Sequence, residues 1–394
     1  MYLLEDPFVS DLLADSARRS RRPVLDTPMA RRHLHVDALT DETGFAETAS
    51  RAGARLYSNS ENALDWVHMH LGEHPVVEAV AALKDKVRFR ELLADLDPDY
   101  AYVEVSADAL NDFDPRSLPA PFVIKPAVGF FSLGVHIVTD PNEWSAVRER
   151  ITRDRVRFAD LYPSRVLDLD RWVAEQVIEG DEFAVDVYYR TDGEAVVLGI
   201  LEHPFAHGAD VSDRVYRTSV EIFDRHLARF EEYLQEFGVR FGLRDFPMHI
   251  ELRVDAKGVI RPIEANPLRF GGWCAADMAF HAWGFDPYLA YLEDRRPDWD
   301  TIFASRRDRV YALVVADLPA DVDRERVDVD FERFASRFSR VLELRRVEDR
   351  RHPVFAFAFV EVERGQEQEL EEVLVADLRE YTRPRSTDPD GIRG

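Results

Sequence analysis

The stretch Ile260–Gly272, IRPIEANPLRFGG, places a carboxylate at Glu264 and an amide at Asn266, two residues apart near the end of an apolar strand. A proline, an arginine and two glycines follow at once. Alternate residues of a strand point to the same face, so Glu264 and Asn266 share one. Packing alone does not require this order of residues. The stretch is therefore a candidate for chemistry, and it needs partners elsewhere in the chain.

The nearest partners lie in the preceding strand, MHIELRV, which the turn Asp255–Gly258 joins to this stretch as a β-hairpin. A two-residue or a four-residue loop gives the same pairing. We therefore expect His249 opposite Glu264. Glu251 is then expected opposite Pro262.

One face of this hairpin combines acidic and amide groups. It should carry His249, Glu251, Arg253, Glu264 and Asn266. Glu251 and Glu264 become diagonal neighbours about 7–8 Å apart. Two carboxylates and an amide oxygen suit Mg²⁺, which completes its octahedral coordination with water and substrate phosphates. A zinc site would typically contain more His or Cys ligands. A solvated strand face with interleaved charges is the alternative on the hairpin alone.

Lysine is rare in this chain. Of 51 basic residues only four are lysines, namely Lys84, Lys86, Lys125 and Lys257. Exposed Lys and Arg are nearly exchangeable, so the lysines that remain mark positions where a compact ammonium is needed. Alternatively, the four lysines are leftovers of sequence drift and have no special role. Lys257, which lies in the turn of residues 255–258, fits that alternative.

Lys125 ends an apolar strand, PFVIKP, just before a loop that carries Gly129, Ser132 and Gly134. A lysine there can reach phosphate oxygens, and glycines let backbone N–H groups approach them. Neither a Walker A loop nor a Rossmann fingerprint is present.

A further segment, WVAEQVIEGDEF, holds Glu175 and Glu182 on either side of an extended hinge. These carboxylates could take an amino group and a pair of ribose hydroxyls, while the hinge backbone serves the edge of a base. Glu179 is expected to be solvated.

Taken in order, five segments resemble the ATP-grasp superfamily. They are KDK (84–86), PFVIKP (121–126), AEQVIEGDEF (174–183), HIEL (249–252) and PIEANPLRFGG (262–272). The resemblance covers about residues 84–300. The loop after Lys125 departs from the family pattern, because it carries Phe130 and Phe131 where many relatives have glycine. An apolar lid is expected there.

The resemblance implies an ATP site and a Mg²⁺ site, with one or two ions and Mn²⁺ as an alternative. Lys86 and Lys125 would contact the phosphates. Glu175 would bind the adenine amino group and Glu182 the ribose. The backbone at the base edge would be that of Gln176, Val177 and Ile178. The implied metal ligands are Glu251, Glu264 and Asn266.

The same resemblance implies the reaction. An acid is activated by phosphoryl transfer from ATP, and an amine displaces the phosphate. Arg269 and Lys125 would be catalytic, with Gly271 and Gly272 beside the substrate. We expect a carboxylate–amine ligase that releases ADP and phosphate, with small carboxylic acids and amines as partners. An ATP-grasp carboxylase or purine-type ligase using bicarbonate or formate is one alternative, and a non-catalytic nucleotide-binding protein is another.

Acceptor recognition is the least defined part. The polar segment 201–219 lies between the hinge and the hairpin, and it is expected to line the acid or amine pocket or to be an exposed connection. Its candidate residues are His203, His207, Asp213 and Arg217.

Length and charge set the remaining bounds. A chain of 394 residues predicts several lobes, here residues 1–83, 84–300 and 301–394. The fold expected is an N-terminal α/β lobe, an ATP-grasp fold of two α+β subdomains clasping ATP, and a small C-terminal α/β appendage with a packing or dimerising role.

A net charge of −24 argues against nucleic-acid and membrane partners. One cysteine and no signal-like N-terminus predict a cytoplasmic protein.

Overall fold

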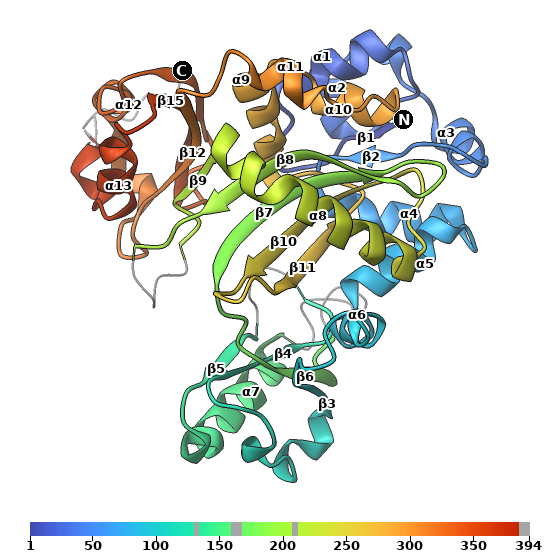
Figure 1. The fold of residues 1–394 in the computed structure, drawn as a ribbon, viewed down its shortest axis with the longest axis vertical. Helices are drawn as coiled ribbons and strands as arrows, with labels where there is room; N and C mark the ends of the chain where they lie inside the picture. The colour runs from blue at the N-terminus through green and yellow to red at the C-terminus, as the bar shows by residue number, and fades with distance from the viewer. Residues whose placement is uncertain (130–133, 159–167, 207–211, 386–394) are drawn as a thin grey trace, which may run out of the picture.

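A computed structural model describes residues 1–129, 134–158, 168–206 and 212–385. The predicted Phe130–Phe131 lid and the candidate His207 lie outside these ranges. Within them, the chain forms one large and one small antiparallel sheet, with helices packed around both (Figure 1).

Among the described residues, the larger sheet has eight strands, all paired antiparallel. In spatial order they are β11 (Ile260–Pro267), β10 (Phe246–Val254), β7 (Asp181–Tyr189), β8 (Ala195–His203), β9 (Val215–Ser219), β12 (Arg309–Asp317), β15 (Val354–Glu363) and β14 (Val341–Arg346). The strand β7, DEFAVDVYY, is buried from Glu182 to its end. A strand in the middle of a sheet that is covered on both faces needs such a nearly continuous apolar run.

Helix α8 (Val220–Phe241) lies across one face of this sheet (Figure 1). Its buried positions include Phe223, Phe230 and Phe237, which recur at helical spacing. Gly238 packs so closely that a Cβ there would stand 2.1 Å from the Tyr189 ring. The missing side chain therefore allows the helix to approach β7.

The N-terminal residues form a lobe beside this sheet. Its parallel pair is β1 (Tyr2–Leu3) and β2 (Tyr57–Ser58), which fits the α/β lobe predicted for this part of the chain. Its helices are α1 (Asp11–Ser20), α2 (Pro28–His33), α3 (Glu42–Ala49) and α4 (Leu64–Leu71). Leu3 and Phe45 belong to the same hydrophobic core as Val187 of β7, so the lobe packs directly on the sheet.

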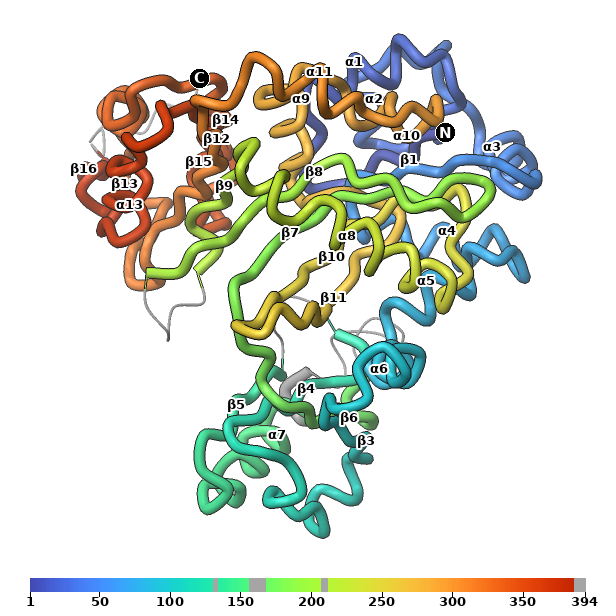
Figure 2. Tube along the Cα trace, in the orientation of Figure 1, coloured from blue at the N-terminus to red at the C-terminus, as the bar shows by residue number. Residues whose placement is uncertain are grey.

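Two helices lead out of this lobe (Figure 2). They are α5 (Pro75–Lys84) and α6 (Lys86–Leu93). The pattern of residues 76–95 predicts one helix that includes both Lys84 and Lys86. This prediction is wrong, because the Asp85 carboxylate accepts hydrogen bonds from the N–H groups of Val87 and Arg88 at 3.0 and 3.1 Å. Asp85 thus caps a new helix, and the two lysines stand on either side of the break.

The smaller sheet forms a separate body that α7 (Trp144–Phe158) covers (Figure 1). Among the described residues its strands are, in order, β3 (Tyr102–Ser106), β6 (Arg171–Gln176), β4 (Phe122–Pro126) and β5 (His136–Val138). It has its own hydrophobic core, which includes Phe122 and Trp172. The chain returns to the larger sheet through Gly180, whose φ is +116° and where a Cβ would stand 2.2 Å from the carbonyl oxygen of Val254. Only glycine fits this hinge.

The last third of the described chain contributes β12, β15 and β14 to the larger sheet, so the segment predicted as an appendage is joined to that sheet through β9. A short antiparallel pair adds β13 (Val327–Val329) and β16 (Thr382–Pro384). The α-helices of this last third are α9 (Met278–Trp283), α10 (Pro287–Leu292), α11 (Trp299–Phe303), α12 (Phe331–Ala335) and α13 (Gln368–Leu374). No helix in the described ranges is long and apolar enough to span a bilayer.

The hairpin of β10 and β11 has the predicted turn but a different register. His249 pairs with Asn266, and Glu251 pairs with Glu264. The loop has three residues, since the Asp255 N–H donates to the Val259 carbonyl at 3.1 Å, and a bulge beyond Glu251 shifts the pairing once more. The two glutamates are therefore directly opposite each other and not diagonal.

Candidate functional site

A pocket lies between the two sheets, and four elements line it. Its residues are Leu83 and Lys84 of α5, Lys86, Phe89 and Arg90 of α6, Lys125 of β4, and Ile263, Glu264 and Ala265 of β11. Three of the chain's four lysines therefore converge with Glu264 at one place. Lys86, Lys125 and Glu264 were predicted as site residues, and the fold brings them together from three separate segments.

The buried carboxylate of Glu175 contacts two of the residues that line this pocket. Lys125 Nζ lies 2.6 Å from one oxygen, and Arg90 Nε donates to the other at 2.6 Å. Burial alone would raise the pKa of Glu175, but the two cations outweigh it and lower the pKa to about 2. Both carboxylate oxygens are thus occupied. A carboxylate oxygen can accept more than one hydrogen bond, so the predicted adenine contact would share an oxygen with one of these cations.

Arg90 was missed in the sequence, although it connects two parts of the site. Besides Glu175, its guanidinium donates to the carbonyl oxygens of Pro262 and Ile263 at 2.7 and 3.3 Å. Helix α6, the hinge strand β6 and the hairpin strand β11 are therefore fastened to one another by a single side chain.

Lys86 stands among other cations. Its Nζ donates to the Gly129 carbonyl at 3.3 Å. Burial, together with the charges of Lys125 and Lys84, lowers the pKa of Lys86 to about 8. Such a cluster of ammonium groups is stabilised by an anion with several oxygens, such as a polyphosphate.

The hinge residues are held by neighbouring segments. The N–H of Gln176 donates to the Ala101 carbonyl at 2.9 Å, and its carbonyl accepts from the Tyr100 hydroxyl at 3.0 Å. The Val177 N–H donates to Pro121 at 3.4 Å. The Ile178 carbonyl accepts from Arg253. These contacts fix the hinge beside the pocket and occupy two of the backbone carbonyls that were predicted at a base edge.

Glu182, predicted at a ribose, lies in a second buried network. Its oxygens accept from His203 Nδ1 at 3.0 Å and from Arg253 Nη2 at 2.8 Å. Burial alone would raise the pKa of Glu182, but the His203 hydrogen bond and the Arg253 charge lower the pKa below its ordinary value. The His203 ring also stacks on Tyr216, with centroids 4.3 Å apart.

The acceptor candidates separate in the structure. His203 contacts Glu182, and Asp213 accepts from the Tyr216 hydroxyl at 2.7 Å, so both lie beside the second network. Arg217 follows Tyr216 along β9, hence faces the other side of the sheet, where it donates to Glu202 at 2.6 Å. The structure therefore groups His203 with Asp213 and leaves Arg217 apart.

The opposed carboxylates of Glu251 and Glu264 form the predicted metal face. Burial and the charge of Glu264 raise the pKa of Glu251 well above its ordinary value, and Glu182 and Asp213 add to the effect. Burial would also raise the pKa of Glu264, but Lys84 and Lys86 lower it below its ordinary value. The amide of Asn266 donates to Glu264 at 3.2 Å.

A divalent cation suits this arrangement, because it would relieve the repulsion that Glu251 experiences. Among the residues that the structure describes, no group of three or more His, Cys, Asp or Glu side chains is placed to hold a metal ion. An ion here would thus take its remaining ligands from an amide oxygen, water and phosphate, as Mg²⁺ commonly does.

Arg269 is held from the N-terminal lobe. Its Nη2 donates to Glu61 at 3.2 Å, and Glu61 also pairs with Lys84 at 2.8 Å. Leu268 just before it has a φ of +60°, a conformation that a residue with a Cβ rarely adopts. Glu61 was missed, since 208 residues separate it from Arg269.

The glycine pair lies against β7 and β10. The Gly271 N–H donates to the Asp186 carboxylate at 2.8 Å, and Asp186 also bonds His249 Nδ1 at 2.8 Å. A Cβ at Gly271 would stand 3.6 Å from the His249 ring, and one at Gly272 would stand 3.9 Å from Arg269. His249 thus supports the backbone after Arg269 from within the sheet.

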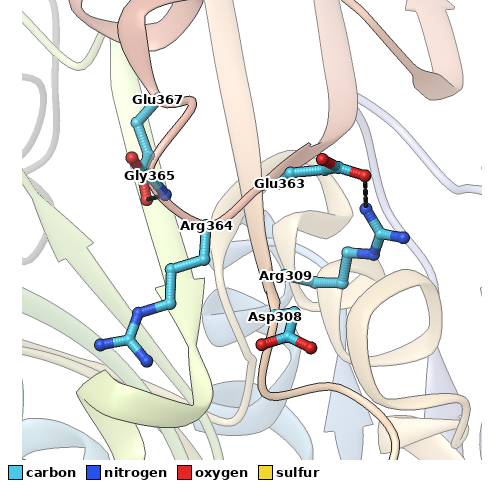
Figure 3. Close-up of a pocket in the computed structure, with 6 residues that line it drawn as sticks. All are labelled: Asp308, Arg309, Glu363, Arg364, Gly365 and Glu367. Carbon is cyan, nitrogen blue, oxygen red and sulfur yellow. Dashed lines mark hydrogen bonds and ion pairs between the residues drawn. The ribbon is translucent and has the colours of Figure 1, made fainter.

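A second hollow lies on the C-terminal part of the chain (Figure 3). Its lining residues are Asp308, Arg309, Glu363, Arg364, Gly365 and Glu367. Arg309 donates to Glu363 at 3.0 Å (Figure 3), and Arg364 pairs at 2.7 Å with Glu221, whose side chain is not drawn there. None of the predicted site residues that the structure describes lines this hollow, whose arginines are already paired with acids.

The chain is similar to known proteins in the sequence of one domain and in its fold. Residues 118–277 match the family model of the ATP-grasp domain. No curated protein sequence matches the chain. The fold is similar to that of an L-amino acid ligase from Bacillus licheniformis, with a TM-score of 0.65 at 17% identity over 98% of each chain.

Two other solved structures are similar to a comparable degree. An N5-carboxyaminoimidazole ribonucleotide synthetase from Thermotoga maritima has a TM-score of 0.64 at 14% identity, over 98% of this chain and 99% of that one. A biotin carboxylase from Campylobacter jejuni has a TM-score of 0.58 at 12% identity, over 92% of this chain and 87% of that one. The TM-scores establish the fold, and identities this low leave the reaction open. The protein therefore has the ATP-grasp fold, and its residues 118–277 form an ATP-grasp domain.

Proposed function

We propose that the protein is an ATP-dependent carboxylate–amine ligase, which forms an amide or peptide bond through an acyl phosphate and releases ADP and phosphate. One observation carries the proposal. Lys86 and Lys125 converge with Glu264 on a single pocket, and Glu264 stands opposite Glu251. Cations for a polyphosphate thus lie next to paired acids for a divalent cation, which is the combination that phosphoryl transfer requires.

In this proposal Lys86 and Lys125 hold phosphate oxygens, and Glu175 keeps Lys125 oriented toward the pocket. Glu182 and the hinge from Gln176 to Ile178 bind the nucleoside. Glu251, Glu264 and Asn266 hold magnesium, which when bound neutralises the charge that develops on the phosphates.

Arg269 acts on the acceptor side. Its guanidinium donates to the phosphoryl group in transfer and then to the acyl phosphate, which stabilises the negative charge of both. Glu61 orients Arg269 until substrate arrives. Gly271 and Gly272 leave room for the acid, and His203 and Asp213, which lie beside Glu182 and Tyr216, are the candidates to contact the amine.

The alternative reactions remain open because the structural similarities are of comparable strength. The TM-scores to the amino acid ligase and to the ribonucleotide synthetase are 0.65 and 0.64. A carboxylase or purine-type ligase would use bicarbonate or formate as the acid. A non-catalytic nucleotide-binding protein would bind ATP and turn over nothing.

A matrix of carboxylic acids and amines, with bicarbonate and formate among the acids, tests the proposal by release of phosphate and identification of the nucleotide product. We expect ADP and phosphate to form only when an acid and an amine are both present. AMP and pyrophosphate would contradict the acyl-phosphate route. Turnover that depends on bicarbonate would favour the carboxylase, and tight ATP binding without turnover would favour the non-catalytic protein.

A further inference from the structure

The backbone that follows the glycine pair is strained. Trp273 has φ and ψ of 55° and 29°, and Cys274 has 56° and 39°. Both residues have backbone angles in the left-handed helical region, which the Cβ of an L-residue disfavours. Two consecutive residues in it persist only where the surroundings hold them.

A buried arginine of β14 stabilises this backbone conformation. Arg345 Nη1 donates to the carbonyl of Trp273 at 2.7 Å and to that of Cys274 at 3.4 Å. Its Nη2 donates to Asp277 at 2.8 Å, and its Nε donates to Glu343 at 3.0 Å. A guanidinium has its donors in one rigid plane, so it can fix two carbonyls and two carboxylates together.

The same guanidinium is held between two aromatic rings. Its central carbon lies 4.9 Å from the ring centroid of Phe8 and 4.8 Å from that of Phe359. Arg345 is only 6% exposed. It thus joins the N-terminal segment, the C-terminal strands and the turn at Trp273 in one buried contact.

This turn continues directly from the proposed phosphoryl site. Arg269 Nη1 donates to the Phe270 carbonyl at 2.9 Å, and the Gly271 N–H donates to Asp186 at 2.8 Å. The segment from Arg269 to Cys274 is therefore anchored by Asp186 near its start and by Arg345 at its end.

We infer that Arg345 is a positioning residue, which locks the turn at Trp273 and Cys274 and so fixes Arg269 and the glycine pair toward the acceptor. The inference rests on the proposed function for what the fixed segment does. It gives the C-terminal strands, for which the sequence offered only packing or dimerisation, a direct role in the site.

The test compares Arg345→Lys with Arg55→Lys. Arg55 is a close match, since it is 7% exposed, pairs with Asp245 and Asp294 at 3.0 Å each, and lies 5.7 Å from the rings of Tyr188 and Tyr291. It touches none of the proposed site residues. Lysine keeps the charge in both variants but cannot reproduce the planar set of donors.

The first measurement uses Cys274, the single cysteine of the chain, as a reporter. Its thiol is 2% exposed, so it reacts with a disulfide reagent such as Ellman's reagent only when the turn opens. We expect Arg345→Lys to speed this reaction by about tenfold or more and Arg55→Lys to leave it near the wild-type rate. Equal rates in the two variants would overturn the inference.

The second measurement is kinetic, on the acid and amine pair found by the phosphate-release matrix. Arg345→Lys should lower kcat/KM for the acid by about tenfold or more and change the Kd for ATP by less than about threefold. A loss of similar size in Arg55→Lys, or a loss confined to ATP binding, would contradict positioning.

The two measurements separate the inference from the proposed function. Thiol reactivity does not depend on turnover. A chain that turns over no acid and amine would overturn the ligase proposal, whereas an unprotected Cys274 in the wild type would overturn the role of Arg345 even in an active ligase.

Discussion

Two carboxylates of the site, Glu175 and Glu251, lie in opposite electrostatic environments. Glu175 stands between Arg90 and Lys125, and its pKa falls to about 2. Glu251 faces other acids, and its pKa rises well above the ordinary value. A carboxylate that is paired with cations stabilises the protein and orients those cations. A carboxylate surrounded by other acids is repelled by them, and a bound cation can relieve this repulsion. The electrostatics thus separate the structural acid from the proposed metal ligand.

Substitution of Glu264, which stands opposite Glu251, should have the largest effect on turnover. Glu264→Gln removes a charge from the proposed metal face and leaves the shape of the side chain. We expect ADP formation to fall about a thousandfold, since catalytic charge stabilisation of this kind is worth about 3–4 kcal/mol. Glu179→Gln at an exposed position of the hinge is the control and should keep wild-type activity. Retained activity in Glu264→Gln would remove this face from the mechanism.

Substitution of Glu175 should have the largest effect on stability. Glu175→Gln leaves Arg90 and Lys125 without their buried counter-charge, which typically costs about 3–5 kcal/mol in the free energy of unfolding. Denaturant unfolding measures this. The control is Glu104→Gln, because the pair of Glu104 with Arg171 is exposed and worth about 1 kcal/mol or less.

The effect of Glu175→Gln on the free energy of unfolding should also depend on pH. The pKa of Glu175 is lower in the folded protein, so its contribution is complete above the ordinary value of 4.5 and is lost as the pH falls toward about 2. The stability difference between wild type and Glu175→Gln should therefore narrow only at acid pH. A difference that stayed constant from pH 7 to pH 3 would show that Glu175 is not held by its charges.

Glu251 should respond in the opposite direction. Its raised pKa means that the ionised form destabilises the folded protein, increasingly as the pH rises from the ordinary value toward the folded one. Glu251→Gln should therefore stabilise the metal-free protein at pH 8 relative to the wild type. Added Mg²⁺ should then stabilise the wild type and not the variant. Thermal unfolding with and without Mg²⁺ measures both, and a destabilised variant would mean that Glu251 is structural.

The contrast between these two acids was only partly visible in the sequence. The period of two along a strand correctly placed Glu251, Glu264 and Asn266 on one face. It could not give their partners, because a three-residue loop and a bulge each moved the register by one. Glycine at 258, with a φ of +83°, was the local sign of such a loop.

The buried ion pairs were not predictable in the same way. Arg90 and Glu175 are 85 residues apart, and each lies in a segment whose local pattern is that of an ordinary amphipathic helix or strand. Their contact depends on how α6 packs against β6, which a tertiary fold decides. The scarcity of lysine, by contrast, marked all four lysines as candidates from composition alone, and three of them line the pocket.

The smallest expected effect concerns the cations of the pocket. The groups that face Lys86 are Lys84 of α5, Lys125 of β4, Glu175 of β6 and Glu264 of β11. Because its pKa is about 8, Lys86 is largely charged at pH 7 and largely neutral at pH 9. The Kd for ATP should rise by a few fold over this range in the wild type, at most about tenfold. In Lys86→Arg the Kd should not change with pH, because arginine keeps its charge.

Calorimetric titration of ATP at several pH values measures this difference. The control is Lys257→Arg, which lies in an exposed turn. A rise of the same size in Lys86→Arg would assign the pH dependence to another group, and Lys86 would then not hold the phosphates.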